Sequence, residues 1–166
     1  MGTILPRLCL SSNRRFIVNE EGYPFFWLGD TAWELFHRLD RKEAKLYFVN
    51  RQLKRFNVVQ AVILAELDGL NTPNAYGERQ LHDNDPEKPN EAYFHLIDEY
   101  LTLAANHEIY VALLPTWGDK VMQLWGVGPV IFSDRSAFSF GKFLGERYKD
   151  RSNLIWVLGG DRPAAS

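Results

Sequence analysis

The chain has 166 residues, of which 46% are hydrophobic and 14% aromatic, enough to bury the core of one compact domain. Its 19 basic and 21 acidic side chains are spread along the sequence and give a formal charge of −2. No basic stripe is available to neutralise phosphates or lipid headgroups, so we expect neither nucleic acid nor a membrane as a partner. The N-terminus lacks the continuous apolar core of a signal peptide, which predicts a cytoplasmic location for the chain as written.

Cysteine and histidine give no indication of a metal site. Cys9 is the only cysteine, so an internal disulfide is excluded, and its neighbours Leu8 and Leu10 favour a buried position over a role as a nucleophile. The four histidines are scattered, without zinc-ligand spacing, and are expected on the surface or on helix faces. We therefore expect no metal and no other cofactor.

The N-terminal residues 1–24 are predicted to form a β-hairpin that leads into a main domain of residues 25–166. Residues 14–19 alternate apolar and polar side chains, and Glu-Gly and Tyr-Pro turn signals follow them. The apolar run Phe25–Leu28 does not alternate, which predicts a strand covered on both faces that Gly29 and Asp30 end.

Helices and strands then alternate along the chain. The predicted helices run from Asp40 to Arg55, from Asn90 to Glu108 and from Ser133 to Asp150, and the predicted strands cover 57–65, 109–117 and 153–158. Two connections, 66–89 and 118–132, are longer than ordinary loops and are expected to have a function of their own.

The order hairpin, strand, helix, strand, helix, strand, helix, strand predicts an α/β fold with four parallel strands and right-handed crossovers. Two sheet architectures fit this order of elements. An open doubly wound sheet would be complete at this size, whereas a (β/α)8 barrel needs about 250 residues and would be half built. The pattern alone does not choose between them.

Carboxylates, amides and indoles follow all four predicted strands, where loops at the carboxyl edge of a parallel sheet converge. Such side chains suit a sugar, because its hydroxyls need polar partners and its C–H faces stack on tryptophan. A phosphate site is the rival, but no GxxxxGK[ST] motif is present. The candidate substrate-binding residues are Asp30, Trp33, Asp68, Asn71, Tyr76, Trp117, Lys120, Trp125 and Arg162.

Each candidate has a structural alternative. Asp30 either binds a sugar hydroxyl or holds the first loop in place. The tryptophans either stack on sugar or pack within loops. Hydrogen bonds inside the long loop are an equal alternative for Asp68, Asn71 and Tyr76, and Lys120 beside Asp119 is more often a solvated pair.

Several long motifs resemble the apiosidase-like glycoside hydrolases over nearly the whole chain. They are PFFWLGDTAWELFHRLDRKEA (24–44), AELDGLNTPNAYGERQL (65–81), NDPEKPNEAYF (84–94), LLPTWGDK (113–120), WGVGP (125–129) and LGERYKDRSNLIWVLGGDR (144–162). The resemblance implies the N-terminal half of a (β/α)8 barrel, truncated after its fourth strand, in an enzyme that removes a terminal sugar from plant cell-wall pectic glycans. Many relatives are exported.

The resemblance also implies a catalytic residue. Barrel glycosidases of this type carry a carboxyl acid/base after the fourth strand and a second carboxylate after the seventh, and Asp161 in LGGDR matches the first position. It would protonate the leaving-group oxygen. We expect the second carboxylate beyond Ser166, so this polypeptide alone is predicted to be inactive.

Two alternatives remain open beside an oligosaccharide-cleaving enzyme. The chain is either a non-catalytic carbohydrate-binding remnant or an open-sheet α/β structural module in which Asp161 is a turn residue. A half barrel would expose two sheet edges with unpaired backbone groups, which predicts self-association.

Overall fold

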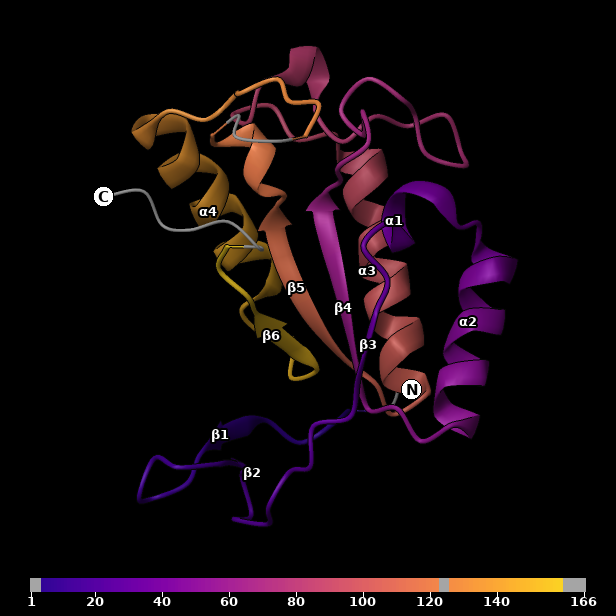
Figure 1. The fold of residues 1–166 in the computed structure, drawn as a ribbon, viewed down its shortest axis with the longest axis vertical. Coiled ribbons are helices and arrows are strands. Elements are labelled where there is room, and N and C mark those ends of the chain that lie inside the picture. Colours follow the sequence, from indigo (N-terminus) through magenta and orange to yellow (C-terminus); the bar gives the residue numbers. More distant parts are fainter. Residues whose placement is uncertain (1–3, 123–125, 160–166) are drawn as a thin grey trace.

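The structure, a computed structural model, describes residues 4–122 and 126–159. An antiparallel hairpin precedes a four-stranded parallel sheet with the strand order β3-β4-β5-β6. Figure 1 shows the hairpin below the N-terminal ends of these strands, with the helices beside and behind the sheet. The predicted α/β fold with four parallel strands after a hairpin is therefore confirmed.

The hairpin differs from its prediction in the position of its first strand. Strand β1 (Leu8–Leu10) pairs with β2 (Ile17–Asn19), so β2 lies inside the predicted strand, but residues 14–16 belong to the connection. Pro24 forms only an isolated bridge with Val18. The expected burial of Cys9 is wrong, since it is exposed on a strand of this two-stranded sheet.

Strand β3 (Gly29–Thr31) begins where the predicted strand was expected to end. It pairs in parallel with β4 (Val58–Leu64), whereas Phe26, inside the predicted strand, is 78% exposed. The Asn57 side chain explains the shift, because its Oδ1 accepts from Leu28 N at 2.9 Å and its Nδ2 donates to Phe26 O at 2.6 Å. The Asn57 side chain thus forms hydrogen bonds with backbone groups of Phe26 and Leu28 that a neighbouring strand would otherwise bind.

Strands β5 (Tyr110–Thr116) and β6 (Leu154–Trp156) confirm the last two predicted strands, although β6 is shorter. Successive backbone N–H groups of β5 point to opposite neighbours. Tyr110 N donates to Asn57 O, just before β4, and Val111 N donates to Asn153 O, just before β6. Odd-numbered residues of β5 therefore donate toward β6. Pro115 has no N–H to continue this series. The missing donor explains why the pairing ends at Leu113 and Trp156.

The three predicted helices are confirmed as α2 (Arg41–Leu53), α3 (Glu91–Asn106) and α4 (Asp134–Tyr148), and a short α1 (Leu35–Arg38) was not predicted. Each long helix starts at a side-chain cap, namely Asp40, Asn90 or Ser133. Two 3-10 turns, η1 (His82–Asn84) and η2 (Gly118–Lys120), lie in the long loops. No described helix has the length and apolarity needed to cross a membrane.

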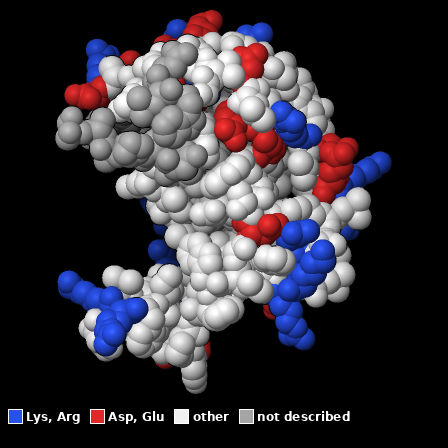
Figure 2. Space-filling model, viewed as in Figure 1, with Lys and Arg blue, Asp and Glu red and all other residues white. Residues whose placement is uncertain are grey.

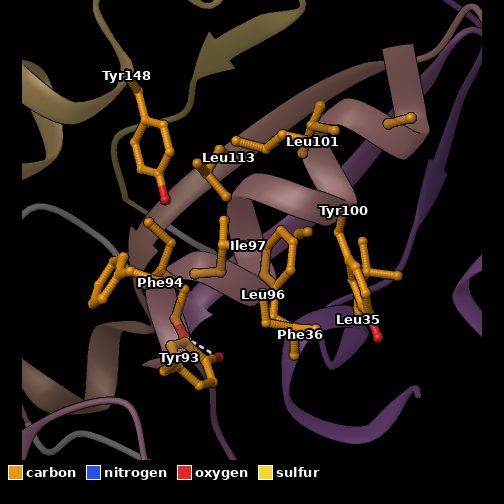
Figure 3. Close-up of a cluster of buried hydrophobic side chains, with 14 of the residues drawn as sticks. Leu35, Phe36, Tyr93, Phe94, Leu96, Ile97, Tyr100, Leu101, Leu113 and Tyr148 are labelled. Atoms are coloured by element: carbon orange, nitrogen blue, oxygen red, sulfur yellow. Dashed lines mark hydrogen bonds between the residues drawn. The ribbon is translucent and has the colours of Figure 1, made fainter. Parts of the chain in front are cut away.

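The main core lies between the sheet and the helices. Val59, Ala61 and Ile63 of β4 pack against α2, α3 and α4 on this side, and the Tyr93 hydroxyl of α3 donates to Ile63 O at 2.9 Å. Figure 3 shows the aromatic and aliphatic side chains of α3 gathered there. The alternating strand residues, such as Val58 and Val62, form separate clusters on the other face.

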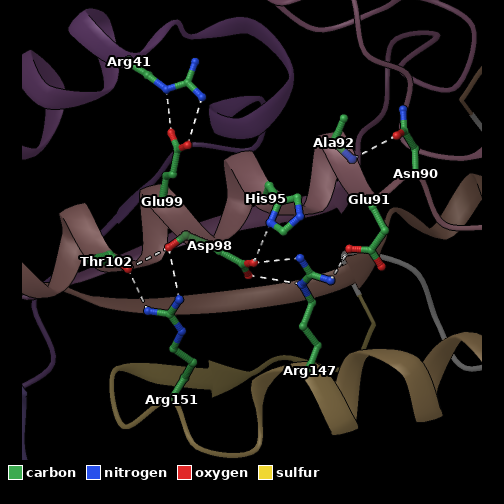
Figure 4. Close-up of polar contacts among 10 residues, drawn as sticks. All are labelled: Arg41, Asn90, Glu91, Ala92, His95, Asp98, Glu99, Thr102, Arg147 and Arg151. Atoms are coloured by element: carbon green, nitrogen blue, oxygen red, sulfur yellow. Dashed lines mark hydrogen bonds and ion pairs between the residues drawn. The ribbon is translucent and has the colours of Figure 1, made fainter.

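The helices are tied together by charged side chains on their outer side. Arg147 of α4 binds Asp98 at 2.7 Å and Glu91 at 2.8 Å, both on α3, and the Arg41 guanidinium of α2 binds Glu99 of α3 (Figure 4). These ion pairs hold α2, α3 and α4 as one layer.

The described helices cover only one face of the sheet. A doubly wound sheet needs helices on both faces, whereas a barrel has them on the outside only. Figure 2, viewed onto the other face, shows a largely uncharged surface and a hollow above the hairpin. Apolar residues of the hairpin and of β6 line a groove there. The arrangement is that of half a (β/α)8 barrel, and the open-sheet alternative loses its support.

Candidate active site

Two predicted sugar-binding residues meet at the carboxyl edge of the sheet. Trp33 follows β3 and Trp117 follows β5, and their ring centroids lie 5.2 Å apart with an interplanar angle of 56°. Both pack over Val62 and Leu114 on the helix-free face. Trp117 is only 6% exposed, whereas Trp33 is partly exposed. Trp33 is therefore the more accessible indole of the pair, and Trp117 packs beneath it in the cluster.

The end of β6 joins this cluster. Val157 packs against Val62, Leu114 and Trp117, and its N–H donates to Leu113 O at 3.1 Å. The described chain thus leaves the sheet beside the tryptophan pair, four positions before Asp161. Three predicted site residues, Trp125, Asp161 and Arg162, lie outside the described residues.

The expectation that Asp119 and Lys120 form a solvated pair is wrong. Both side chains are fully buried, and Lys120 Nζ lies 2.8 Å from Asp119 Oδ1. Gly128 N donates to Asp119 Oδ2 at 2.9 Å, and Lys120 O accepts from Ile131 N at 2.9 Å. The pair therefore closes the loop that follows β5, and its described contacts are internal to that loop.

Asp30 lies on the helix side of the sheet, away from the tryptophan pair. Its Oδ2 accepts from the Tyr47 hydroxyl at 2.7 Å and from Arg51 Nη1 at 2.6 Å, both on α2. Burial alone would raise the pKa of Asp30, but these bonds and the Arg51 charge lower it below its usual value. This geometry corresponds to the loop-holding alternative.

The candidates of the loop after β4 bind mainly one another or α2. Asp68 Oδ1 accepts from Asn71 Nδ2 at 2.6 Å. The Tyr76 hydroxyl accepts from Arg41 N at 2.7 Å, and the Arg41 guanidinium lies 4.4 Å from the Tyr76 ring centre. The structure does not bring these side chains into the tryptophan cluster.

The structure also reveals a hydrogen-bonded pair, formed by a buried histidine and a partly exposed glutamate, that the sequence prediction missed. His37, expected on a surface or helix face, is 4% exposed, and its Nδ1 lies 2.7 Å from Glu34 Oε2. The hydrogen bond with Glu34 raises the pKa of His37, although burial opposes the rise. The spacing of three residues between Glu34 and His37 was the available sequence signal, but it is common in helices.

No cluster of three or more His, Cys, Asp or Glu side chains within residues 4–122 and 126–159 is arranged to hold a metal ion. The described edge offers a ligand an indole face and nearby polar loops.

The fold and this edge define the class of protein. A barrel with its helices outside carries its site at the carboxyl edge of the strands, and an indole pair there suits a sugar ligand. A solved structure described as a glycoside hydrolase matches with a TM-score of 0.82 and 32% identity, over 96% of this chain and 36% of that one.

Two further solved structures also match this chain. A glycoside hydrolase family 5 protein from Bacteroides vulgatus ATCC 8482 matches with a TM-score of 0.82 and 33% identity, over 96% of this chain and 34% of that one. An endo-1,4-beta-mannanase from Rhizomucor miehei shares the fold alone, with a TM-score of 0.60, 16% identity and coverage of 100% and 52%. The chain spans about a third of the length of the first two structures.

The family model described as the apiosidase-like catalytic domain matches residues 11–166, and the chain belongs to this family. A comparison with curated proteins found no match.

Proposed function

We propose that the chain forms the N-terminal half of the catalytic domain of a glycoside hydrolase that acts on pectic glycans of plant cell walls. The observation that carries the proposal is the Trp33–Trp117 pair at the carboxyl edge of the sheet, in a chain of the apiosidase-like family. A partly exposed indole can stack on the C–H face of a sugar ring, and the buried second indole fixes its position.

Asp161 is the proposed acid/base. Its carboxyl proton passes to the glycosidic oxygen as the bond between that oxygen and the anomeric carbon breaks, and the leaving sugar departs as an alcohol. In a retaining enzyme a second carboxylate about 5 to 5.5 Å away bonds to the anomeric carbon, and water then replaces it there. In an inverting enzyme a carboxylate about 6.5 to 9.5 Å away takes a proton from the water that bonds to the anomeric carbon. We assign that second carboxylate to no residue of this chain.

The neighbouring loops supply the other proposed contacts. Trp125 and Arg162 belong to the proposed sugar site through their motifs, WGVGP and LGGDR. The buried Asp119–Lys120 pair keeps the loop after β5 folded, so we assign Lys120 to the support of the site.

A non-catalytic carbohydrate-binding function is the second candidate. The tryptophan pair favours it, because a stacking surface needs no acid and is built from described residues alone. In that case the polypeptide binds pectic oligosaccharides without cleaving them.

Calorimetry with pectic oligosaccharides, combined with chromatography of the products, separates these functions. If the chain is half of a hydrolase domain, it binds alone without releasing a sugar. A polypeptide extended to include the second carboxylate then releases a sugar, and its Asp161→Asn variant binds without releasing it. The matched control Glu146→Gln alters a carboxylate that is 69% exposed and should keep wild-type behaviour.

Each other outcome has a definite meaning. Binding without any product, even from the extended polypeptide, supports the binding function. Equal product from the extended polypeptide with and without Asp161→Asn contradicts the acid/base assignment, and the absence of both binding and product contradicts the proposal.

A further inference from the structure

His37 connects two of the loops at the carboxyl edge. It belongs to α1, directly after the segment that carries Trp33, and its Nε2 lies 2.9 Å from Thr72 O in the loop after β4. Its Nδ1 lies 2.7 Å from Glu34 Oε2, and the side chain is 4% exposed. One buried ring therefore bridges the segment after β3 and the loop after β4.

The two contacts require a proton on each side of the ring. A carbonyl oxygen only accepts, so Nε2 must carry a hydrogen to bind Thr72 O. With Nε2 protonated, a neutral ring would direct the lone pair of Nδ1 at the Glu34 carboxylate. The two contacts together therefore need one more proton than a neutral His37 ring and an ionised Glu34 carboxylate supply.

The surroundings of the ring favour this extra proton. Among the described residues, the charged groups that act on His37 are the Glu34 carboxylate, which stabilises the cation, and the Arg38 guanidinium, which opposes it. Arg38 Nε also lies 3.4 Å from Glu34 Oε2, but its side chain is 57% exposed. The uncharged residues that line the neighbouring groove come from the loop after β4, namely Leu67, Thr72, Pro73, Asn74 and Ala75.

We propose that His37 is a positioning residue whose doubly protonated ring fastens the segment carrying Trp33 to the loop after β4. The connection itself follows from the contacts of His37. Its consequence, a sugar-binding edge that is ordered in the protonated state and loosened by deprotonation, rests on the function proposed above.

The sign of the pH dependence follows from the raised pKa of His37. When the loops separate, the ring becomes an ordinary histidine with a pKa of about 6.5. The stabilisation is then complete below about pH 6.5 and is lost as the pH rises through the raised pKa of the closed state. Each unit of that rise corresponds to about tenfold in the closing equilibrium.

Amide hydrogen exchange of the peptide covering residues 66–81 tests the connection without any ligand. After correction for intrinsic exchange, protection in the wild type should fall with rising pH, about tenfold for each unit by which the pKa of His37 exceeds 6.5. His37→Gln should be less protected and independent of pH. The control His95→Gln, at a side chain that is 70% exposed, should follow the wild type.

Glu34→Gln provides a second variant if His37→Gln does not fold. It removes the charge that holds the proton but keeps a side chain of the same shape, so the midpoint of the fall should move to lower pH. An NMR titration of the His37 ring in the wild type must give the same midpoint as the exchange data. Protection that does not vary with pH in the wild type, or an unchanged midpoint in Glu34→Gln, overturns the proposal.

Calorimetry with pectic oligosaccharides over the same pH range tests the consequence. Affinity should weaken through the His37 titration in the wild type and in His95→Gln, but not in His37→Gln. If no oligosaccharide binds at any pH, the proposed function fails, and the exchange experiment still decides whether His37 connects the loops.

Discussion

Trp33 and Trp117 touch across the end of the strand that separates their own strands. Trp33 follows β3, Trp117 follows β5, and β4 lies between these strands. The two residues are 84 positions apart in sequence but share one cluster on the helix-free face. Because Trp33 is partly exposed and Trp117 is buried, we expect Trp33 to contact the ligand and Trp117 to stabilise the fold.

Replacing each tryptophan should separate binding from stability. Trp33→Ala should weaken binding of pectic oligosaccharides roughly tenfold, which corresponds to about 1.4 kcal/mol, with a smaller loss of stability. Trp117→Ala should lower the free energy of unfolding by about 3 to 5 kcal/mol, because it empties a buried site. Calorimetry and urea unfolding measure the two effects. Equal losses of stability in both variants would contradict these roles.

Asp30 should stabilise the fold in a pH-dependent way. Asp30→Asn is expected to cost about 1 to 3 kcal/mol near neutral pH, because Tyr47 and Arg51 lose a charged acceptor. The pKa of Asp30 in the folded protein is lowered from its ordinary value of 3.8, so this contribution is present above that value and is lost as the pH falls through the lowered pKa.

Thermal unfolding of the wild type and Asp30→Asn between acid and neutral pH checks this expectation. The difference between the two proteins should shrink toward acid pH. Asp83→Asn, at a side chain that is 79% exposed, is the control and should show little difference. A constant difference across the pH range would count against a role for the Asp30 charge.

The buried pair of Asp119 and Lys120 should be sensitive to the loss of one partner. Lys120→Met leaves the Asp119 carboxylate buried without its cation, which is expected to cost about 3 to 5 kcal/mol. Adding Asp119→Asn removes the uncompensated charge and keeps an acceptor for Gly128 N, so the double variant should recover part of the loss. Urea unfolding of all four proteins in the cycle measures this coupling, and strict additivity would refute it.

Arg147 should contribute more to stability than an exposed arginine on the same helix. Its side chain is 16% exposed and binds Asp98 and Glu91, so Arg147→Met is expected to cost about 1 to 3 kcal/mol. Arg135 is 86% exposed, and Arg135→Met should change stability by less than about 0.5 kcal/mol. Chemical denaturation of the two variants compares them directly, and equal effects would argue against the ion-pair layer.

The open face of the sheet should promote self-association of this polypeptide. Within the described residues, β3 and β6 each pair with a strand on one side only, and no described helix covers the second face. Unpaired edges and apolar surface favour pairing with another chain. Sedimentation velocity should show larger species as concentration rises, and a constant monomer value over the whole range would disprove the expectation.

Local sequence signals identified the elements that depend on neighbouring residues. The capping residues Asp40, Asn90 and Ser133 and the apolar periodicity after them were sufficient for α2, α3 and α4. The β-branched apolar runs likewise identified β4 and β5. These signals are local, since a cap acts within one helical turn and a buried strand needs a continuous apolar run.

Strand β3 shows where local signals fail. The apolar run Phe25–Leu28 looked like a strand, but Asn57 binds its backbone from 29 positions away along the chain, and the ladder starts at Gly29. Register also decides which face a side chain occupies, because strand residues alternate. Asp30 therefore faces α2 instead of the tryptophan pair, and sequence spacing could not show this.

The sequence by itself determined the order of elements, the four parallel strands and membership of the apiosidase-like family, because these depend on local patterns and long motifs. Only the tertiary structure decided that the described helices lie on one face of the sheet, that Trp33 and Trp117 touch, and that Lys120 and His37 are buried. Such features depend on contacts between distant segments, and the burial of a polar side chain depends on the partner that the fold places beside it.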